Sequence, residues 1–125
     1  MAELKYTKDH ECVYVDGDMA WVGISQHAQD ALGDLVFVEL PDVGKTVSKG
    51  DDVAVVESVK TAAEVYSPVD GEIVEINEPM GEDYALISNA VNDDGWIVKV
   101  KVADASALND LMDEAAYAEY LKEVD

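Results

Sequence analysis

The sequence predicts a mainly β fold, a sandwich or a barrel, accompanied by two helices. Short runs rich in β-branched residues follow one another along the chain, and Gly or Pro separates many of them. Segments 71–76 and 96–102 alternate apolar and polar residues, which is typical of strands with one buried face. At 125 residues the chain fits one domain, residues 1–125, which can bury a core without disulfides.

The expected strands can be placed in chain order. Residues 12–15 lead into the turn pair Asp16-Gly17, and residues 19–24 follow that pair, so the two runs predict a hairpin. Further strands are expected at 35–40, 53–57 and 62–66, followed by the two alternating segments 71–76 and 96–102.

Two segments carry helix signals. A short helix is expected near residues 25–32, because Ser25 is a suitable N-cap and Gly33 a suitable C-cap. A longer C-terminal helix is expected near residues 104–122, where the apolar residues would share one face that packs on the sheet. Those apolar residues are Leu108, Leu111, Met112, Ala115 and Leu121.

The composition is strongly acidic. The chain has 28 Asp and Glu against 8 Lys, with a formal net charge of -20. This balance argues against binding to nucleic acid or to an anionic membrane, and it favours partners with basic surfaces. No apolar run approaches the ~18 residues of a membrane span, and the first residues lack a signal-peptide pattern. We therefore expect a cytoplasmic protein or the mature form of an organellar one.

Residues that could carry catalysis form no recognisable constellation. His10-Glu11 begins like a zinc-protease helix, but position 14 is Tyr. His10 and His27 are the only imidazoles, and each is expected at the surface or as a cap. Cys12 is the only cysteine, which excludes an intrachain disulfide, and it is expected to be a small buried hydrophobe. We expect neither a metal site nor an enzymatic activity.

Lys60 stands between two strand-like runs. Segment 57–62 joins them without the Gly, Pro, Asn or Asp that ordinary hairpin tips use. A lysine held there would project on a long stem from a rigid support. Its amine would be accessible to an enzyme that acylates it.

The segment VESVKTAAEVYSPVDGEIVEIN (56–77) resembles the lipoylation segment of the H proteins of the glycine cleavage system. The likeness covers nearly the whole chain, through YTKDHE, VGISQHAQDALGDLVFVELPDVGKTVSKGD, DDGWIVKVKV and the C-terminal helix. The resemblance implies a barrel-sandwich hybrid fold with lipoate amide-linked to Lys60. At matching positions, it also implies that Glu57 and Gly71 help the lipoylating enzyme to recognise the hairpin.

The resemblance further implies a non-catalytic shuttle, expected to be monomeric. In the family, a pyridoxal-phosphate glycine decarboxylase loads an aminomethyl group on the lipoyl arm. A folate-dependent aminomethyltransferase takes the one-carbon unit, and dihydrolipoamide dehydrogenase reoxidises the dithiol. The loaded arm is implied to fold back into a cleft, where Glu11 and Glu64 are our candidates to hold its amine. Family members more often carry Asp at the position of Glu64.

Other carriers fit the residues less well. Biotin carriers typically have Met on both sides of the modified lysine, whereas Val59 and Thr61 flank Lys60 here. Lipoyl domains of 2-oxo acid dehydrogenases usually show Asp-Lys-Ala at the tip. Two alternatives stay open: an H-like protein that donates lipoate to other lipoate-dependent enzymes, and an unmodified interaction module. The chain departs from the family at Cys12, where Trp is usual, and in segment 78–96.

Overall fold

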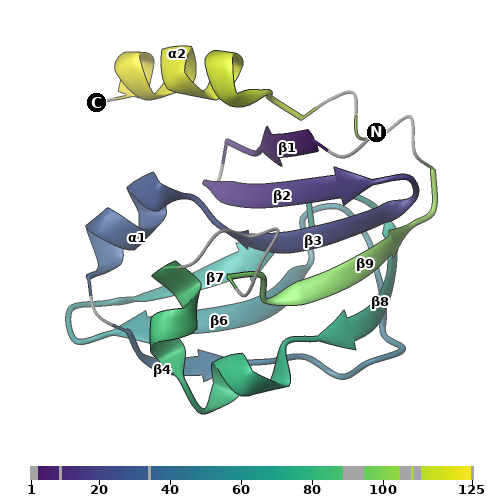
Figure 1. Cartoon of the computed structure of the whole chain (residues 1–125), viewed down its shortest axis with the longest axis horizontal. Helices are drawn as coiled ribbons and strands as arrows, with labels where there is room; N and C mark the ends of the chain where they lie inside the picture. The colour runs from purple at the N-terminus through teal and green to yellow at the C-terminus, as the bar shows by residue number, and fades with distance from the viewer. Residues whose placement is uncertain are drawn as a thin grey trace.

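The computed structural model describes residues 3–8, 10–33, 35–88, 95–104, 108 and 111–124, and it folds them into two antiparallel sheets with two α-helices (Figure 1). One sheet contains β1 (Glu3–Tyr6), β2 (Glu11–Asp16), β3 (Met19–Ile24), β9 (Val98–Val102), β8 (Gly71–Ile76) and β5 (Thr46–Val47), in that order across the sheet. The other contains β4 (Leu35–Glu39), β6 (Asp52–Ser58) and β7 (Ala62–Tyr66). The helices are α1 (Gln26–Leu32) and α2 (Glu114–Val124), and two 3-10 turns are η1 (Glu78–Gly81) and η2 (Tyr84–Ser88).

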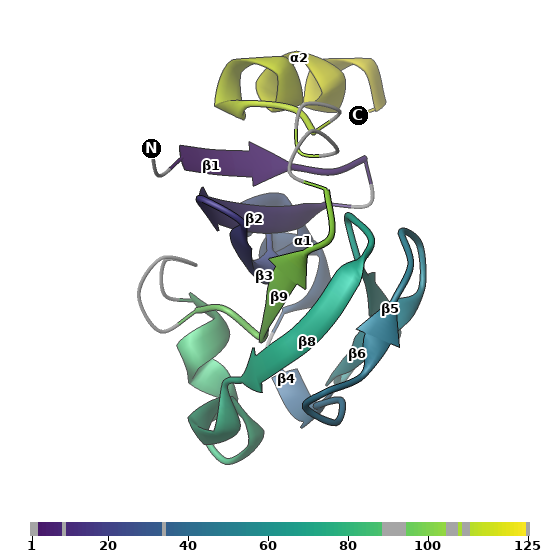
Figure 2. The same ribbon diagram turned by 90° about the vertical axis from the view of Figure 1, so that its right-hand side faces the viewer.

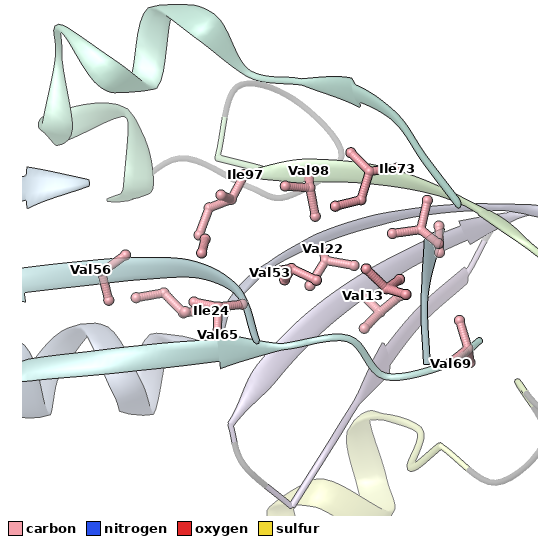
Figure 3. Close-up of a cluster of buried hydrophobic side chains, with 14 of the residues drawn as sticks. Val13, Val22, Ile24, Val53, Val56, Val65, Val69, Ile73, Ile97 and Val98 are labelled. Atoms are coloured by element: carbon pink, nitrogen blue, oxygen red, sulfur yellow. The ribbon is translucent and has the colours of Figure 1, made fainter. Parts of the chain in front are cut away.

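The core lies where the two sheets face each other (Figure 3). Val13 and Val22 reach it from the six-stranded sheet, and Val56 and Val65 reach it from the three-stranded sheet. Each of these side chains is at most 1% exposed. Burying such a side chain stabilises a fold by roughly 1.5–3 kcal/mol, so this shared core holds the two sheets together.

The expected mainly β architecture is confirmed, and so are the predicted turn at Gly17 and the predicted helix caps at Ser25 and Gly33. Gly17 adopts a φ of 65° in the turn between β2 and β3, a conformation that glycine takes without a steric cost. Ser25 caps α1, because its Oγ accepts a hydrogen bond from the Ala28 amide at 3.2 Å. Gly33 ends the helix with a φ of 80°.

The C-terminal helix begins later than the expected residue 104. Asp113 precedes α2 and caps it, since its Oδ1 accepts a hydrogen bond from the Ala116 amide at 2.8 Å. Just before, Met112 pairs with Tyr6 as an isolated antiparallel bridge, through backbone hydrogen bonds of 2.7 and 2.9 Å. This extended pairing is incompatible with a helix through residue 112. Figure 2 shows α2 lying over β1.

The apolar face expected for this helix differs accordingly. Ala115 is exposed and Leu121 is half-buried, and among the side chains of α2 that the structure describes, the buried one is Tyr117, which is 5% exposed. Leu108 is buried but precedes the helix, while residues 105–107 and 109–110 lie outside the described part of the chain. A tyrosine therefore takes the place of the aliphatic stripe in anchoring α2.

Candidate functional site

Lys60 occupies the turn between β6 and β7. The two strands pair through Val56 with Ala63 and through Glu57 with Ala62, which leaves residues 59–61 as the connection. The hairpin is part of the three-stranded sheet, and its turn lies at one end of the molecule's long axis (Figure 1). Strand β6 therefore continues to Ser58, only two residues before Lys60, and supports the turn.

Ser58 fixes the conformation of this turn. Its amide donates to the Thr61 carbonyl at 2.7 Å, and its Oγ accepts from the amides of Lys60 and Thr61, each at 3.2 Å. Ser58 is only 8% exposed, so these hydrogen bonds are shielded from water. Serine hydroxyls can imitate a backbone turn, which explains how the tip closes without Gly, Pro, Asn or Asp.

The Lys60 side chain is exposed, and the neighbouring Val59 is 80% exposed. Within the described part of the chain, no ion pair involves Lys60. The amine is thus presented to solvent on a short turn in which the amides of Lys60 and Thr61 are hydrogen-bonded to Ser58. This geometry suits a lysine that another protein must reach.

A cavity of about 290 Å³ lies between α1 and the β6–β7 hairpin. Its walls include Glu11, three residues of α1 (His27, Ala28 and Leu32) and two residues of β7 (Ala63 and Glu64). The structure therefore brings together the two carboxylates that we singled out from the sequence. Most other side chains of the wall are apolar, so the cavity suits a hydrocarbon group that bears a cation.

The two carboxylates differ in their surroundings. Glu11 is 2% exposed, and its Oε1 accepts a hydrogen bond from Thr7 Oγ1 at 2.7 Å. Glu64 is exposed, and its Oε2 accepts from the Tyr66 hydroxyl at 3.1 Å. An exposed carboxylate is screened by water, whereas a buried one interacts more strongly with a nearby cation.

Two histidines that the sequence placed at the surface or at a cap line the same cavity. The rings of His10 and His27 lie 4.6 Å apart, and neither side chain is fully exposed. His10 has a φ of 70°, in the left-handed region that non-glycine residues seldom adopt. Residue 10 precedes the buried Glu11, and residue 27 is the second residue of α1, but only the tertiary fold brings them together.

Glu57 and Gly71 lie in different places. Glu57 is half-buried on β6, one residue before Ser58, and is paired with Ala62. Gly71 is buried at the start of β8, in the other sheet, and β8 lies away from the β6–β7 turn (Figure 1). A Cβ at residue 71 would lie 2.3 Å from the Lys101 carbonyl oxygen, so the close approach of β9 requires glycine there.

A second cavity of about 330 Å³ also has Glu11 among its lining residues. Tyr6, Lys49 and Leu111 are among its lining residues, while Glu64 and both histidines lie elsewhere. It does not reach the hairpin turn. The cavity beside α1 is the candidate site because it joins the hairpin to both expected carboxylates.

Cys12 lies on β2 and is buried, 7% exposed. Burial raises the pKa of its thiol to about 11, because the thiolate would be poorly solvated there. At neutral pH the side chain is therefore a neutral, small hydrophobe, as the sequence predicts. Among the described residues, no group of three or more His, Cys, Asp or Glu is arranged to hold a metal ion.

Comparisons with known proteins agree with these observations. The family model described as the glycine cleavage H-protein matches residues 4–124. A glycine cleavage system H protein of Parvibaculum lavamentivorans is 51% identical over 122 residues, covering 98% of each chain. One from Escherichia coli is 50% identical over 123 residues, covering 98% of this chain and 95% of the relative.

Among solved structures, the chain is similar to a glycine cleavage system H protein from Mycobacterium marinum. The TM-score is 0.85 with 38% sequence identity, and the match covers 96% of this chain and 97% of that chain. No helix in the described ranges has the length and the apolar character needed to cross a membrane.

Proposed function

We propose that this chain, which belongs to the glycine cleavage H-protein family, carries lipoate as an amide on Lys60. The family is a carrier component of the glycine cleavage system and is not itself catalytic. When bound, lipoate supplies a dithiolane ring whose sulfurs accept two electrons and carry the transferred group. The protein supplies the attachment point, the surroundings of the arm and the surface that partners recognise.

The exposed amine of Lys60 on a stiff turn is the observation that carries this proposal. Ser58 holds the backbone of the turn, and the Lys60 side chain extends from it into solvent. A lipoylating enzyme can approach such an amine without unfolding the hairpin. After amide formation, the same position would let the arm reach successive partners.

The cavity beside α1 fits the loaded arm. Its apolar residues, such as Ala28 and Leu32, would cover the hydrocarbon chain and the sulfurs. The carboxylates of Glu11 and Glu64 would hold the positively charged aminomethyl group, and the cavity would limit its exposure to water. Glu11 would contribute more, because its burial reduces screening.

The lipoylating enzyme would read the hairpin through Glu57. That side chain lies on β6 next to Ser58 and remains partly accessible. Gly71 would act indirectly, because it permits the close packing of β8 on β9 that supports the whole sheet. Recognition at residue 57 and folding at residue 71 are therefore two separate requirements for modification.

The proposed partners are those implied by the family. Glycine decarboxylase, which uses pyridoxal phosphate, would load the aminomethyl group. The folate-dependent aminomethyltransferase would unload it, and dihydrolipoamide dehydrogenase would reoxidise the dithiol. The net charge of -20 would steer all of them through basic surfaces, and brief contacts would allow exchange between partners. We place this cycle in the cytoplasm.

The test combines lipoylation with intact-mass measurement. The unmodified protein is incubated with lipoate, ATP and a lipoylating enzyme, and it should gain the mass of one lipoyl group. The Lys60→Arg variant should fold normally, gain no mass and support no glycine cleavage in a reconstituted system. Lys45→Arg, a change at another exposed lysine, is the matched control and should behave as the parent protein does.

Two outcomes would contradict the proposal. Modification of the Lys60→Arg variant would show that another amine accepts lipoate. A normally lipoylated protein that supports no glycine turnover with the decarboxylase and the aminomethyltransferase would instead favour the lipoate-donor alternative.

A further inference from the structure

One hydroxyl group of the C-terminal helix contacts both a residue that lines the candidate cavity and the N-cap residue of α1. The Tyr117 hydroxyl lies 2.7 Å from His10 Nδ1 and 2.8 Å from Ser25 Oγ. A tyrosine hydroxyl can donate one hydrogen bond and accept another, so it can satisfy both neighbours at once. Burial raises the pKa of Tyr117, which keeps this hydroxyl protonated at neutral pH.

His10 and Ser25 are connected to the cavity in different ways. His10 itself lines the cavity, whereas Ser25 caps α1, the helix that contributes His27, Ala28 and Leu32. The two are also joined directly, because the Ser25 amide donates to the His10 carbonyl at 2.8 Å. The Tyr117 hydroxyl therefore contacts the place where His10, the residue before β2, is hydrogen-bonded to Ser25, the residue before α1.

The backbone of His10 needs such support. Its φ of 70° is uncommon for a residue with a Cβ, and a conformation of this kind persists only where neighbours hold it. The His10 carbonyl is held by the Ser25 amide, and its ring is held by Tyr117. Without the hydroxyl of Tyr117, the ring would lose the hydrogen bond at Nδ1.

Tyr117 is itself firmly placed. Its ring stacks on the ring of Tyr6, with centroids 4.5 Å apart and planes 1° from parallel. The backbone bridge between Met112 and Tyr6 fixes the approach to α2, and Asp113 caps the helix. Contacts with β1 and the cap of α2 therefore hold the Tyr117 ring independently of the hydrogen bonds that its hydroxyl makes.

We infer that Tyr117 is a positioning residue for the cavity, and that through its hydroxyl the C-terminal helix sets how well the loaded arm is shielded from water. This inference rests on the proposed function, because it takes the cavity beside α1 as the place where the arm is held. Tyr117 acts through His10 and Ser25, and it is not assigned a contact with the arm.

The first test uses the unmodified protein, where no arm is present. Tyr117→Phe removes the hydroxyl and keeps the ring that stacks on Tyr6. Hydrogen exchange at the Ser25 and Ala28 amides should become about tenfold faster, since both amides belong to the network that the hydroxyl completes. Tyr120→Phe is the matched control, because it removes a hydroxyl of α2 whose one hydrogen bond to the described residues is with the exposed Lys8 carbonyl at 3.3 Å. Tyr120→Phe should leave the hydrogen-exchange rates of both amides unchanged.

The second test measures the loaded arm on the lipoylated protein. Hydrolysis of the aminomethyl group consumes one water and releases ammonia and formaldehyde, leaving the dithiol. In Tyr117→Phe this release should be about three to tenfold faster at an unchanged rate of lipoylation, because one buried hydrogen-bonding hydroxyl is lost. Tyr120→Phe should release ammonia at the parent rate. If Tyr117→Phe fails to fold, Ser25→Ala removes the other end of this contact together with the N-cap of α1, so it should also speed the release, and unchanged release in Ser25→Ala would overturn the inference.

The outcomes separate this inference from the proposed function. Unchanged exchange and unchanged ammonia release in Tyr117→Phe, with faster release in Glu11→Gln, would overturn the role of Tyr117 and leave the cavity assignment intact. Unchanged release in both variants would overturn the cavity assignment itself. Equal acceleration in Tyr117→Phe and Tyr120→Phe would show a general loosening of α2 and would also overturn the inference.

Discussion

The hairpin turn and the cavity beside α1 are only a few residues apart along β7, but they are built in opposite ways. The turn is exposed, carries a cation and is held by the single side chain of Ser58. The cavity is a partly open hollow that carries carboxylates and is lined by residues from distant parts of the chain. Under the proposed function, attachment of lipoate would require access, whereas holding a labile group would require shelter from water, and the fold would provide the two in separate places.

The largest expected effect is a loss of stability of the whole fold, which would affect the hairpin turn and the cavity together. Gly71→Ala should lower the free energy of unfolding by about 3 kcal/mol, because the new Cβ would meet a backbone oxygen of β9. Chemical denaturation measures this change. Gly81→Ala is the control, since a Cβ there would lie 3.5 Å from Leu40 Cδ1, an ordinary contact, and stability should hardly change. If Gly71→Ala were fully stable but poorly lipoylated, direct recognition of the glycine would be favoured over the steric explanation.

The next effect should be confined to the cavity. Glu11→Gln should shorten the life of the aminomethyl-loaded arm about tenfold, because a neutral amide cannot pair with the cation, although it still accepts from Thr7. Glu64→Gln should have a smaller effect, because residue 64 is exposed. Ammonia release from the loaded protein reports both rates. Glu72→Gln, an exposed change on β8, should have none, and an equal effect of all three would point to net charge alone.

The smallest expected effect should be confined to the turn. Ser58→Ala removes the Oγ that accepts from the amides of Lys60 and Thr61, which should cost about 1 kcal/mol and slow lipoylation about threefold. Lipoylation kinetics followed by mass provide the measurement. The loaded arm should keep its normal lifetime, and Ser48→Ala, an exposed change in the loop after β5, should leave both rates alone. A shortened lifetime in Ser58→Ala would mean that the two regions are coupled.

The sequence predicted those strands and helices that are determined by a pattern of a few neighbouring residues. The alternation of apolar and polar residues located β8, and Ser25 with Gly33 located α1 within one residue. Two strands were not predicted. β1 (Glu3–Tyr6) mixes charged and apolar residues over four positions, and β5 (Thr46–Val47) has only two residues. Such short strands exist because of their neighbours rather than because of their own sequence.

The start of α2 and the composition of the cavity depend on contacts between distant segments. Met112 is extended because it pairs with Tyr6, and nothing near residue 112 encodes that pairing. Likewise, His10 and His27 resemble ordinary polar residues until the fold brings their rings together. Glu11 and Glu64 were singled out through their positions in matched motifs, and both line the same cavity.

The exposed amine at the hairpin tip has an electrical consequence for successive encounters. It is one of only eight cations on the chain, and acylation would neutralise it while Glu57 and Glu64 remain nearby on the same hairpin. The enzyme that attaches lipoate would therefore bind a hairpin tip with both positive and negative charges. Every later partner would bind a tip with negative charges alone. A partner protein could therefore distinguish the modified from the unmodified chain by the charge at the hairpin tip, before it contacts the sulfur atoms of the arm.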